Sequence, residues 1–217
     1  MVKHIFFDLD GTLTDPKPGI VGSIRYALDK LGITEQPDDL DWCIGPPLQE
    51  SFAKLVPDTD PDEAIALYRE RFSDVGLYEN RVFDGTQEML HIVKDCGGEL
   101  YVATSKPHIF AKRILDHFGL SHFFSHIFGA EMDGTRSNKA ELLAYALEKS
   151  GADPHSSLMI GDRKHDIVGA HANGIASAGV LWGYGSRCEL QEAGAQCILS
   201  NVRHLGMLAR RGAISAE

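Results

Sequence analysis

The sequence predicts an α/β fold in which a Rossmann-like parallel sheet carries helices on both faces, together with a small all-helical subdomain. Two observations predict it. From residue 82 onward, short apolar segments alternate with helical patterns, which is typical of a parallel sheet buried on both sides. Between residues 16 and 81 the pattern is helical, with no evident strand. We therefore expect a core domain of residues 1–15 and 82–217 and a helical subdomain of residues 16–81.

The first expected element is a strand over Lys3–Leu9, which is rich in aromatic and β-branched residues and ends in an Asp-Gly turn. The next helix begins near Pro18 and ends at Gly32. A second helix starts at Asp38-Asp39, is interrupted at Gly45-Pro46-Pro47 and resumes through Leu55. A third starts at Asp60-Pro61 and places Tyr68 and Phe72 on its core face.

The remaining elements follow the rhythm of β–α–β units. Apolar periodicity, glycine stops and short β-branched runs set their limits. The expected helices are 86–95, 107–118, 138–150 and 166–173, and the expected strands are 99–104, 126–129, 157–160, 176–180 and 195–199.

Composition excludes several classes of function. The 217 residues carry 21 basic and 31 acidic side chains, and no basic run exceeds Arg210-Arg211, so a nucleic-acid polymer is not an expected partner. No apolar stretch is long enough to span a membrane, and the N-terminus lacks the pattern of a signal peptide. The four cysteines are scattered without a CxxC pair, which indicates reduced thiols. We expect a cytoplasmic protein.

Four aspartates gather at two expected strand ends. Asp8 and Asp10 stand at the end of the first strand, and an extended backbone points both to one side. Asp162 and Asp166 follow the strand 157–160. Carboxyl ends of parallel strands share one edge of a sheet, and carboxylate oxygens are the ligands that Mg²⁺ prefers. Turn formation and helix capping are the alternative, above all for Asp10-Gly11.

Two further positions suit a phosphate. Thr104-Ser105 lies where a strand meets a helix, and free backbone N–H groups there attract anions. Taken alone, this pair is more simply explained as an ordinary helix N-cap. Lys139 stands near the first turn of its helix, against the macrodipole, as a functional cation or as a solvated surface lysine. Lys106 has the same ambiguity.

These residues resemble the motifs of the haloacid dehalogenase superfamily, in its phosphatase branch, over nearly the whole chain. The segment from Asp8 to Thr14 (DLDGTLT) resembles the first motif, and Thr104-Ser105 resembles the second. Lys139 resembles the third motif, and the segment from Gly161 to Asp166 (GDRKHD) resembles the fourth, GDxxxD. The first and fourth motifs, in this order and at these strand ends, carry the specific signal.

The resemblance implies a role for each residue. Asp8 is expected to be the nucleophile that forms an aspartyl-phosphate, and Asp10 the acid and base. Gly11, Thr104, Ser105 and Lys139 are expected to hold the phosphate, with Thr104 and Lys139 also counted as catalytic. The ligands of Mg²⁺ are expected to be Asp8, Asp10, Asp162 and Asp166.

The helical block resembles the α-helical cap of this superfamily. Ile44-Gly45-Pro46-Pro47 and the context of the fourth motif are similar to phosphoglycolate phosphatases and the bacterial 5′-nucleotidase-like branch. The implied function is Mg²⁺-dependent hydrolysis of a small phosphorylated metabolite by a monomer or homodimer. A phosphomutase of the same superfamily and a non-catalytic phosphate-binding relative remain as alternatives.

Overall fold

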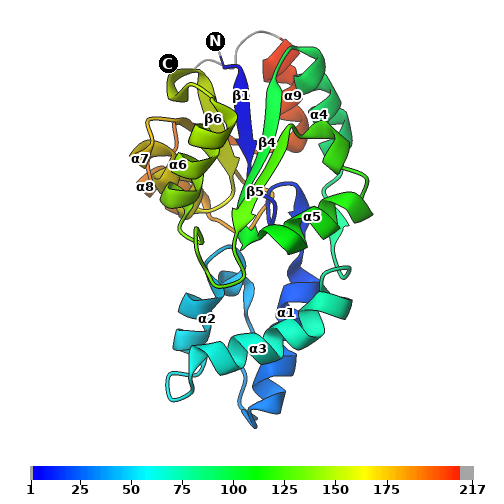
Figure 1. The fold of residues 1–217 in the computed structure, drawn as a ribbon, viewed down its shortest axis with the longest axis vertical. Helices are drawn as coiled ribbons and strands as arrows, with labels where there is room; N and C mark the ends of the chain where they lie inside the picture. Colours follow the sequence, from blue (N-terminus) through cyan, green and yellow to red (C-terminus); the bar gives the residue numbers. More distant parts are fainter. Residues whose placement is uncertain (1, 211–217) are drawn as a thin grey trace.

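Six parallel strands form the main sheet of the protein, in the order β5-β4-β1-β6-β7-β8 (Figure 1). The structure is a computed structural model and describes residues 2–210. The predicted parallel α/β fold is confirmed. The strands are β1 (His4–Phe7), β4 (Glu99–Pro107), β5 (His126–Ala130), β6 (Ser157–Gly161), β7 (Ala176–Val180) and β8 (Cys197–Leu199).

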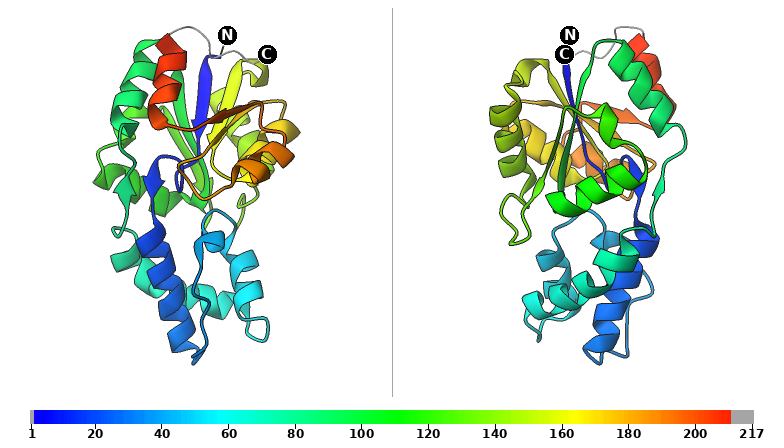
Figure 2. Two further views of the ribbon diagram at one scale, coloured as in Figure 1. Left: turned by 180° about the vertical axis from the view of Figure 1, so that it is seen from behind. Right: turned by 45° about the vertical axis from the view of Figure 1, so that its right-hand side comes forward.

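Side chains alternate across β1, because successive residues of a strand point to opposite faces. Phe6 packs in one apolar cluster with residues of α6 (Lys139–Ser150) and α7 (Lys164–Ala172). Ile5 and Phe7 pack in the other with residues of α4 (Thr86–Asp95), α5 (His108–His117) and α9 (Val202–Arg210). Figure 2 shows α9 beside α4 on the second face. The helices of the core are α4 (Thr86–Asp95), α5 (His108–His117), α6 (Lys139–Ser150), α7 (Lys164–Ala172), α8 (Arg187–Glu192) and α9 (Val202–Arg210).

A separate group of helices lies beyond the carboxyl edge of the sheet (Figure 1). We call residues 17–76 the helical unit. It contains α1 (Lys17–Lys30), a 3₁₀ turn (Asp41–Cys43), α2 (Leu48–Leu55), α3 (Pro61–Arg71) and a π-helical turn (Phe72–Gly76). Its helices pack on one another mainly through α1 against α3.

The chain enters and leaves the helical unit through one short antiparallel ribbon. Strand β2 (Thr14–Asp15) pairs with β3 (Arg81–Val82), with Asp15 opposite Arg81. The boundaries expected from sequence, 15/16 and 81/82, fall in this ribbon. Two-residue strands carry no periodic pattern, so the ribbon could not be read from the sequence. Residues 211–217, assigned to the core from sequence, lie outside the described residues.

Several expected elements differ from the structure. The helix expected from Asp38 is only the 3₁₀ turn at residues 41–43, because Pro37 and Gly45-Pro46-Pro47 leave too few residues between breakers. Strand β4 runs on to Pro107, and α5 begins at His108. Helix α7 begins at Lys164, two residues before the expected start, and α8 and α9 were not expected.

No helix within residues 2–210 has the length and apolar character needed to cross a membrane.

Candidate active site

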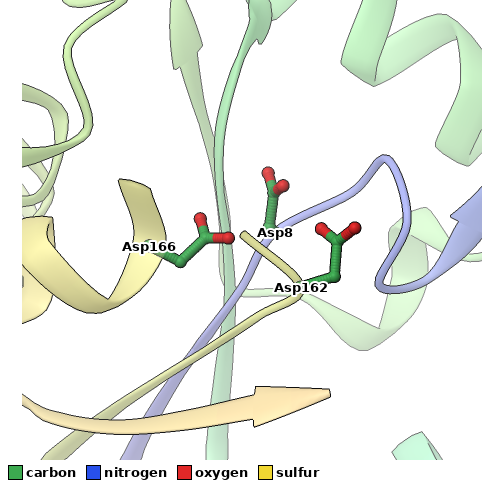
Figure 3. Close-up of side chains that lie close together, drawn as sticks. All are labelled: Asp8, Asp162 and Asp166. Atoms are coloured by element: carbon green, nitrogen blue, oxygen red, sulfur yellow. The ribbon is translucent and has the colours of Figure 1, made fainter. Parts of the chain in front are cut away.

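Three buried carboxylates meet where β1 and β6 end (Figure 3). Asp8 follows β1, Asp162 follows β6, and Asp166 lies in the first turn of α7. One oxygen atom from each lies within 4.8 Å of the others. The two strands are neighbours in the sheet, and the Asp8 amide donates a hydrogen bond to the Ile160 carbonyl over 2.9 Å. Sheet register therefore brings Asp8 to Asp162 and Asp166, although more than 150 positions separate it from either of them in the sequence.

Glycines make room for the carboxylates. Gly11 has φ +81°, and a Cβ atom there would lie 2.2 Å from Asp162 Oδ2. A Cβ atom at Gly161 would lie 2.1 Å from Asp166 Cγ. At Gly183, a Cβ atom would lie 2.4 Å from Asp162 Cβ. Any side chain at these positions would displace a carboxylate, so all three positions require glycine.

The electrostatics of the cluster suit a cation. Burial raises the pKa of Asp162 well above its usual range, and the charges of Asp166 and Asp8 raise it further. Burial also raises the pKa of Asp166 to about 6, against the opposing effect of Lys139. Asp162 Oδ1 is buried and has no hydrogen-bond partner among the described residues. An all-oxygen donor set with an unpaired buried oxygen fits Mg²⁺, a hard cation that prefers carboxylates.

Lys139 compensates part of this negative charge. Its Nζ lies 3.0 Å from Asp8 Oδ1 and 2.8 Å from Asp166 Oδ1, and it donates to the Ala103 carbonyl over 2.9 Å. Asn138 caps α6, so Lys139 is the first residue of the helix, and its side chain extends into the site. Burial lowers the pKa of Lys139, but the two carboxylates outweigh it and leave the pKa above the usual range. The alternative of a solvated surface lysine is wrong, because its side chain is only 4% exposed.

Asp10 lies outside the three-carboxylate cluster. Its Oδ2 accepts from Lys106 Nζ at 2.7 Å, while its Oδ1 is buried without a hydrogen-bond partner among the described residues. Burial raises the pKa of Asp10, and Lys106 opposes that rise. The Lys106 Nζ also sits 4.5 Å from the centre of the Phe72 ring. Lys106 is thus buried beside a predicted catalytic residue, which spacing alone left undecided.

Thr104 and Ser105 reach the site from the end of β4. Thr104 Oγ1 accepts from the Lys106 amide over 3.3 Å. The alternative reading of this pair as a helix cap is wrong, because the N-cap of α5 is Pro107, whose ψ of 132° is extended. Lys106 precedes a proline and is therefore held extended as well.

These residues open into a pocket between the sheet edge and the helical unit. The core contributes Asp8, Asp10, Thr104, Ser105, Lys106, Pro107 and Phe110. The helical unit contributes Ile20, Cys43, Gly45, Pro46, Pro47, Leu48, Tyr68, Arg69 and Phe72. Tyr68 and Phe72 pack in the core, as their spacing predicts, and also line this pocket. Sequence periodicity identifies the buried face of α3 but carries no information on what that face meets.

The loop after β7 also serves the site, which was not foreseen. The Tyr184 amide donates to Asp162 Oδ2 over 2.7 Å, and Trp182 Nε1 donates to the Thr12 carbonyl over 2.9 Å. Gly183 and Gly185 are the signal that could have revealed it. A Cβ atom at Gly185 would lie 1.8 Å from the Asp162 carbonyl oxygen.

Fold and site together define an α/β enzyme whose acidic residues meet at the carboxyl edge of a parallel sheet, where such folds place their chemistry. Residues 5–180 match the family model of the haloacid dehalogenase-like hydrolases. The chain therefore belongs to this family.

Similar proteins agree with this assignment. A 5′-nucleotidase of Pseudomonas aeruginosa is 50% identical over 192 residues, which cover 87% of this chain and 86% of that protein. A crystal structure described as a predicted phosphatase of Clostridium acetobutylicum has a TM-score of 0.91 and 40% identity, and the match covers 97% and 99% of the two chains. A tyrosine-protein kinase of Mycobacterium tuberculosis is 43% identical over 182 residues, 83% of this chain and 62% of that protein. The predicted membership of the superfamily is confirmed, and the expected enzyme class is a phosphoric monoester hydrolase.

Proposed function

We propose that this protein hydrolyses a small phosphomonoester, with Mg²⁺, through an aspartyl-phosphate on Asp8. The observation that carries the proposal is the buried group of Asp8, Asp162, Asp166 and Lys139, of which Asp8 also lines the pocket together with Asp10. The sequence resemblance favours substrates like phosphoglycolate or a nucleoside 5′-monophosphate.

Asp8 and Asp10 would carry out the nucleophilic attack and the proton transfers of the reaction. An Asp8 carboxylate oxygen attacks phosphorus, the bond from phosphorus to the leaving oxygen breaks, and Asp10 gives that oxygen a proton. Water then attacks phosphorus while Asp10 takes a proton from it. The bond between phosphorus and Asp8 breaks, and inorganic phosphate leaves.

The surrounding groups would position the phosphoryl group and neutralise its negative charge. Thr104, Ser105 and the backbone at Gly11 would bind phosphoryl oxygens, with Lys139 as a nearby positive charge. Asp8, Asp162 and Asp166, with the backbone of Asp10, would hold Mg²⁺, which when bound neutralises charge on the phosphoryl group. Residues 16–81 would act as a cap that closes over the pocket and excludes water.

The test is phosphate release from a panel of phosphomonoesters, with Mg²⁺ and with a chelator. We expect Mg²⁺-dependent release that the Asp8→Asn variant reduces by at least about 10⁴-fold, because an amide is not a nucleophile here. Asp95→Asn, which changes an exposed aspartate on α4, is the matched control and should keep full activity. Turnover by the Asp8→Asn variant would contradict the mechanism. Phosphate that passes to an organic acceptor would indicate a mutase or kinase instead.

A further inference from the structure

Arg69 is a cation that lines the pocket, and no carboxylate within the described part of the chain forms an ion pair with it. It belongs to α3 and lines the pocket together with the predicted catalytic residues. Its Nη2 donates to the Met132 carbonyl over 2.8 Å, and its Nε is buried with no hydrogen-bond partner among the described residues. Within residues 2–210 it forms no ion pair.

The other cation that lines this pocket is already paired. Lys106 Nζ lies 2.7 Å from Asp10 Oδ2, so its charge is met within the protein. A partly desolvated guanidinium without a counter-charge is costly unless a ligand supplies one. Arginine also presents a planar set of donors that matches a carboxylate or phosphate in two parallel hydrogen bonds.

The other residues that the helical unit contributes to this pocket offer few polar partners. Ile20, Pro46, Leu48 and the rings of Tyr68 and Phe72 are apolar or buried. The Tyr68 and Phe72 rings stack on each other, with centroids 5.1 Å apart. A leaving group with many hydroxyls would lose hydrogen bonds to water here without replacing them. These residues suit a leaving group that is otherwise apolar and whose strongly polar end meets Arg69.

We propose that Arg69 binds a second anionic group, a carboxylate or phosphate, on the leaving group of the substrate. This inference rests on the proposed function and narrows its substrate class. It favours acidic phosphomonoesters over nucleoside monophosphates, whose leaving group is neutral. Arg69 is then a specificity residue that touches the substrate away from the reacting phosphoryl group.

The test compares matched esters that differ in this one charge. We would measure kcat/KM for 2-phosphoglycolate against 2-hydroxyethyl phosphate, and for 1,3-propanediol bisphosphate against 3-hydroxypropyl phosphate. The wild-type protein should prefer the charged member of at least one pair by about tenfold or more. The pair that shows the preference identifies carboxylate or phosphate. Arg69→Gln should remove most of this preference, and Arg69→Lys should keep part of it.

Arg113→Gln is the matched control. Arg113 also reaches across from the core, since its Nη2 donates to the Ser73 carbonyl over 2.8 Å, but it does not line the pocket. Its loss should change both members of each pair equally. Equal losses for both members in Arg69→Gln, or a wild-type preference for the neutral esters, would overturn the inference. Hydrolysis of p-nitrophenyl phosphate by the wild-type protein tests the proposed function separately, because its leaving group carries no second anion.

Discussion

At the level of single residues, Lys139 holds two buried carboxylates at once. Removal of one partner from a buried ion pair leaves an uncompensated charge, which costs about 3–5 kcal/mol. We expect Lys139→Met to lower the free energy of unfolding by this amount without Mg²⁺, because Asp8 and Asp166 then repel each other. Added Mg²⁺ should restore part of the loss. Denaturant unfolding with and without Mg²⁺ measures both effects.

The control for this variant lies on the same helix. Lys149 is half-exposed, and its ion pair within residues 2–210 is with its neighbour Glu148. Lys149→Met should change stability by well under about 1 kcal/mol, with no response to Mg²⁺. If the two variants unfold alike in the absence of Mg²⁺, Lys139 does not compensate the cluster.

Asp162 belongs to the three-carboxylate cluster, and its buried Oδ1 has no hydrogen-bond partner among the described residues. Asp162→Asn keeps the shape and removes the charge, so we expect the Mg²⁺ concentration for half-maximal activity to rise at least about tenfold. A Mg²⁺ titration of phosphate release measures the shift, with Asp95→Asn as the reference. An unchanged titration curve would refute the role of Asp162 as a metal ligand.

The site was predictable from sequence where residues stand at strand ends. Asp8, Asp162 and Thr104 could be placed because parallel strands direct their carboxyl ends to one edge. The contacts of Lys139 and Lys106 could not be derived from spacing, because the helix that carries Lys139 and the strand that carries Lys106 meet the site only in the tertiary fold. Arg69 and Tyr184 were missed for the same reason.

At the level of elements, the β2–β3 ribbon is tied to the loop that holds Asp162. Asp15 on β2 accepts from Arg81 on β3 over 2.8 Å and also from the Tyr184 hydroxyl. The amide of the same Tyr184 donates to Asp162. The two segments that connect the core to the helical unit, β2 and β3, are therefore both linked to Asp162, a candidate metal ligand.

The hydrogen bonds to Asp15 should make the stability of the protein depend on pH. Burial raises the pKa of Asp15, but hydrogen bonds from Tyr184 and Arg81 outweigh it and hold the pKa below its usual value of 3.8. The resulting stability is fully present above the ordinary pKa and is lost as pH falls through the lower value in the folded state. We expect Tyr184→Phe to lose less stability than the wild-type protein between about pH 4 and pH 2. Urea midpoints across that range provide the measurement, and identical slopes would contradict the tie.

Element prediction succeeded for long periodic segments and failed for short ones. The helix over residues 138–150 carries a strong apolar repeat and lies at 139–150 in the structure. The ribbon strands have two residues each, and α8 has six, too few to show a period. Proline and glycine stopped the helix expected after Asp38, although the capping residues were present.

At the level of the whole molecule, Arg163 joins the core to the helical unit. Its Nε donates to Glu189 over 3.0 Å, and its Nη1 donates to the Ile44 carbonyl. We expect Arg163→Gln to speed amide hydrogen exchange in residues 41–55, because that segment loses a tie to the core. Lys164→Gln removes the same charge from an exposed neighbour and serves as control. Equal exchange in the two variants would show that the segment is held by other contacts.

The position of β1 in the middle of the sheet also bears on how the chain folds during synthesis. Of the six strands in this sheet it is the first to be synthesised, but both of its partners are late, since His4 pairs with Glu99 and Ser157. The helical unit is complete in sequence before either partner exists, and its helices pack mainly on one another. We expect it to fold first on the nascent chain, while β1 keeps two open edges and its apolar side chains exposed. During that interval β1 is the segment most exposed to aggregation and the one a chaperone would have to protect.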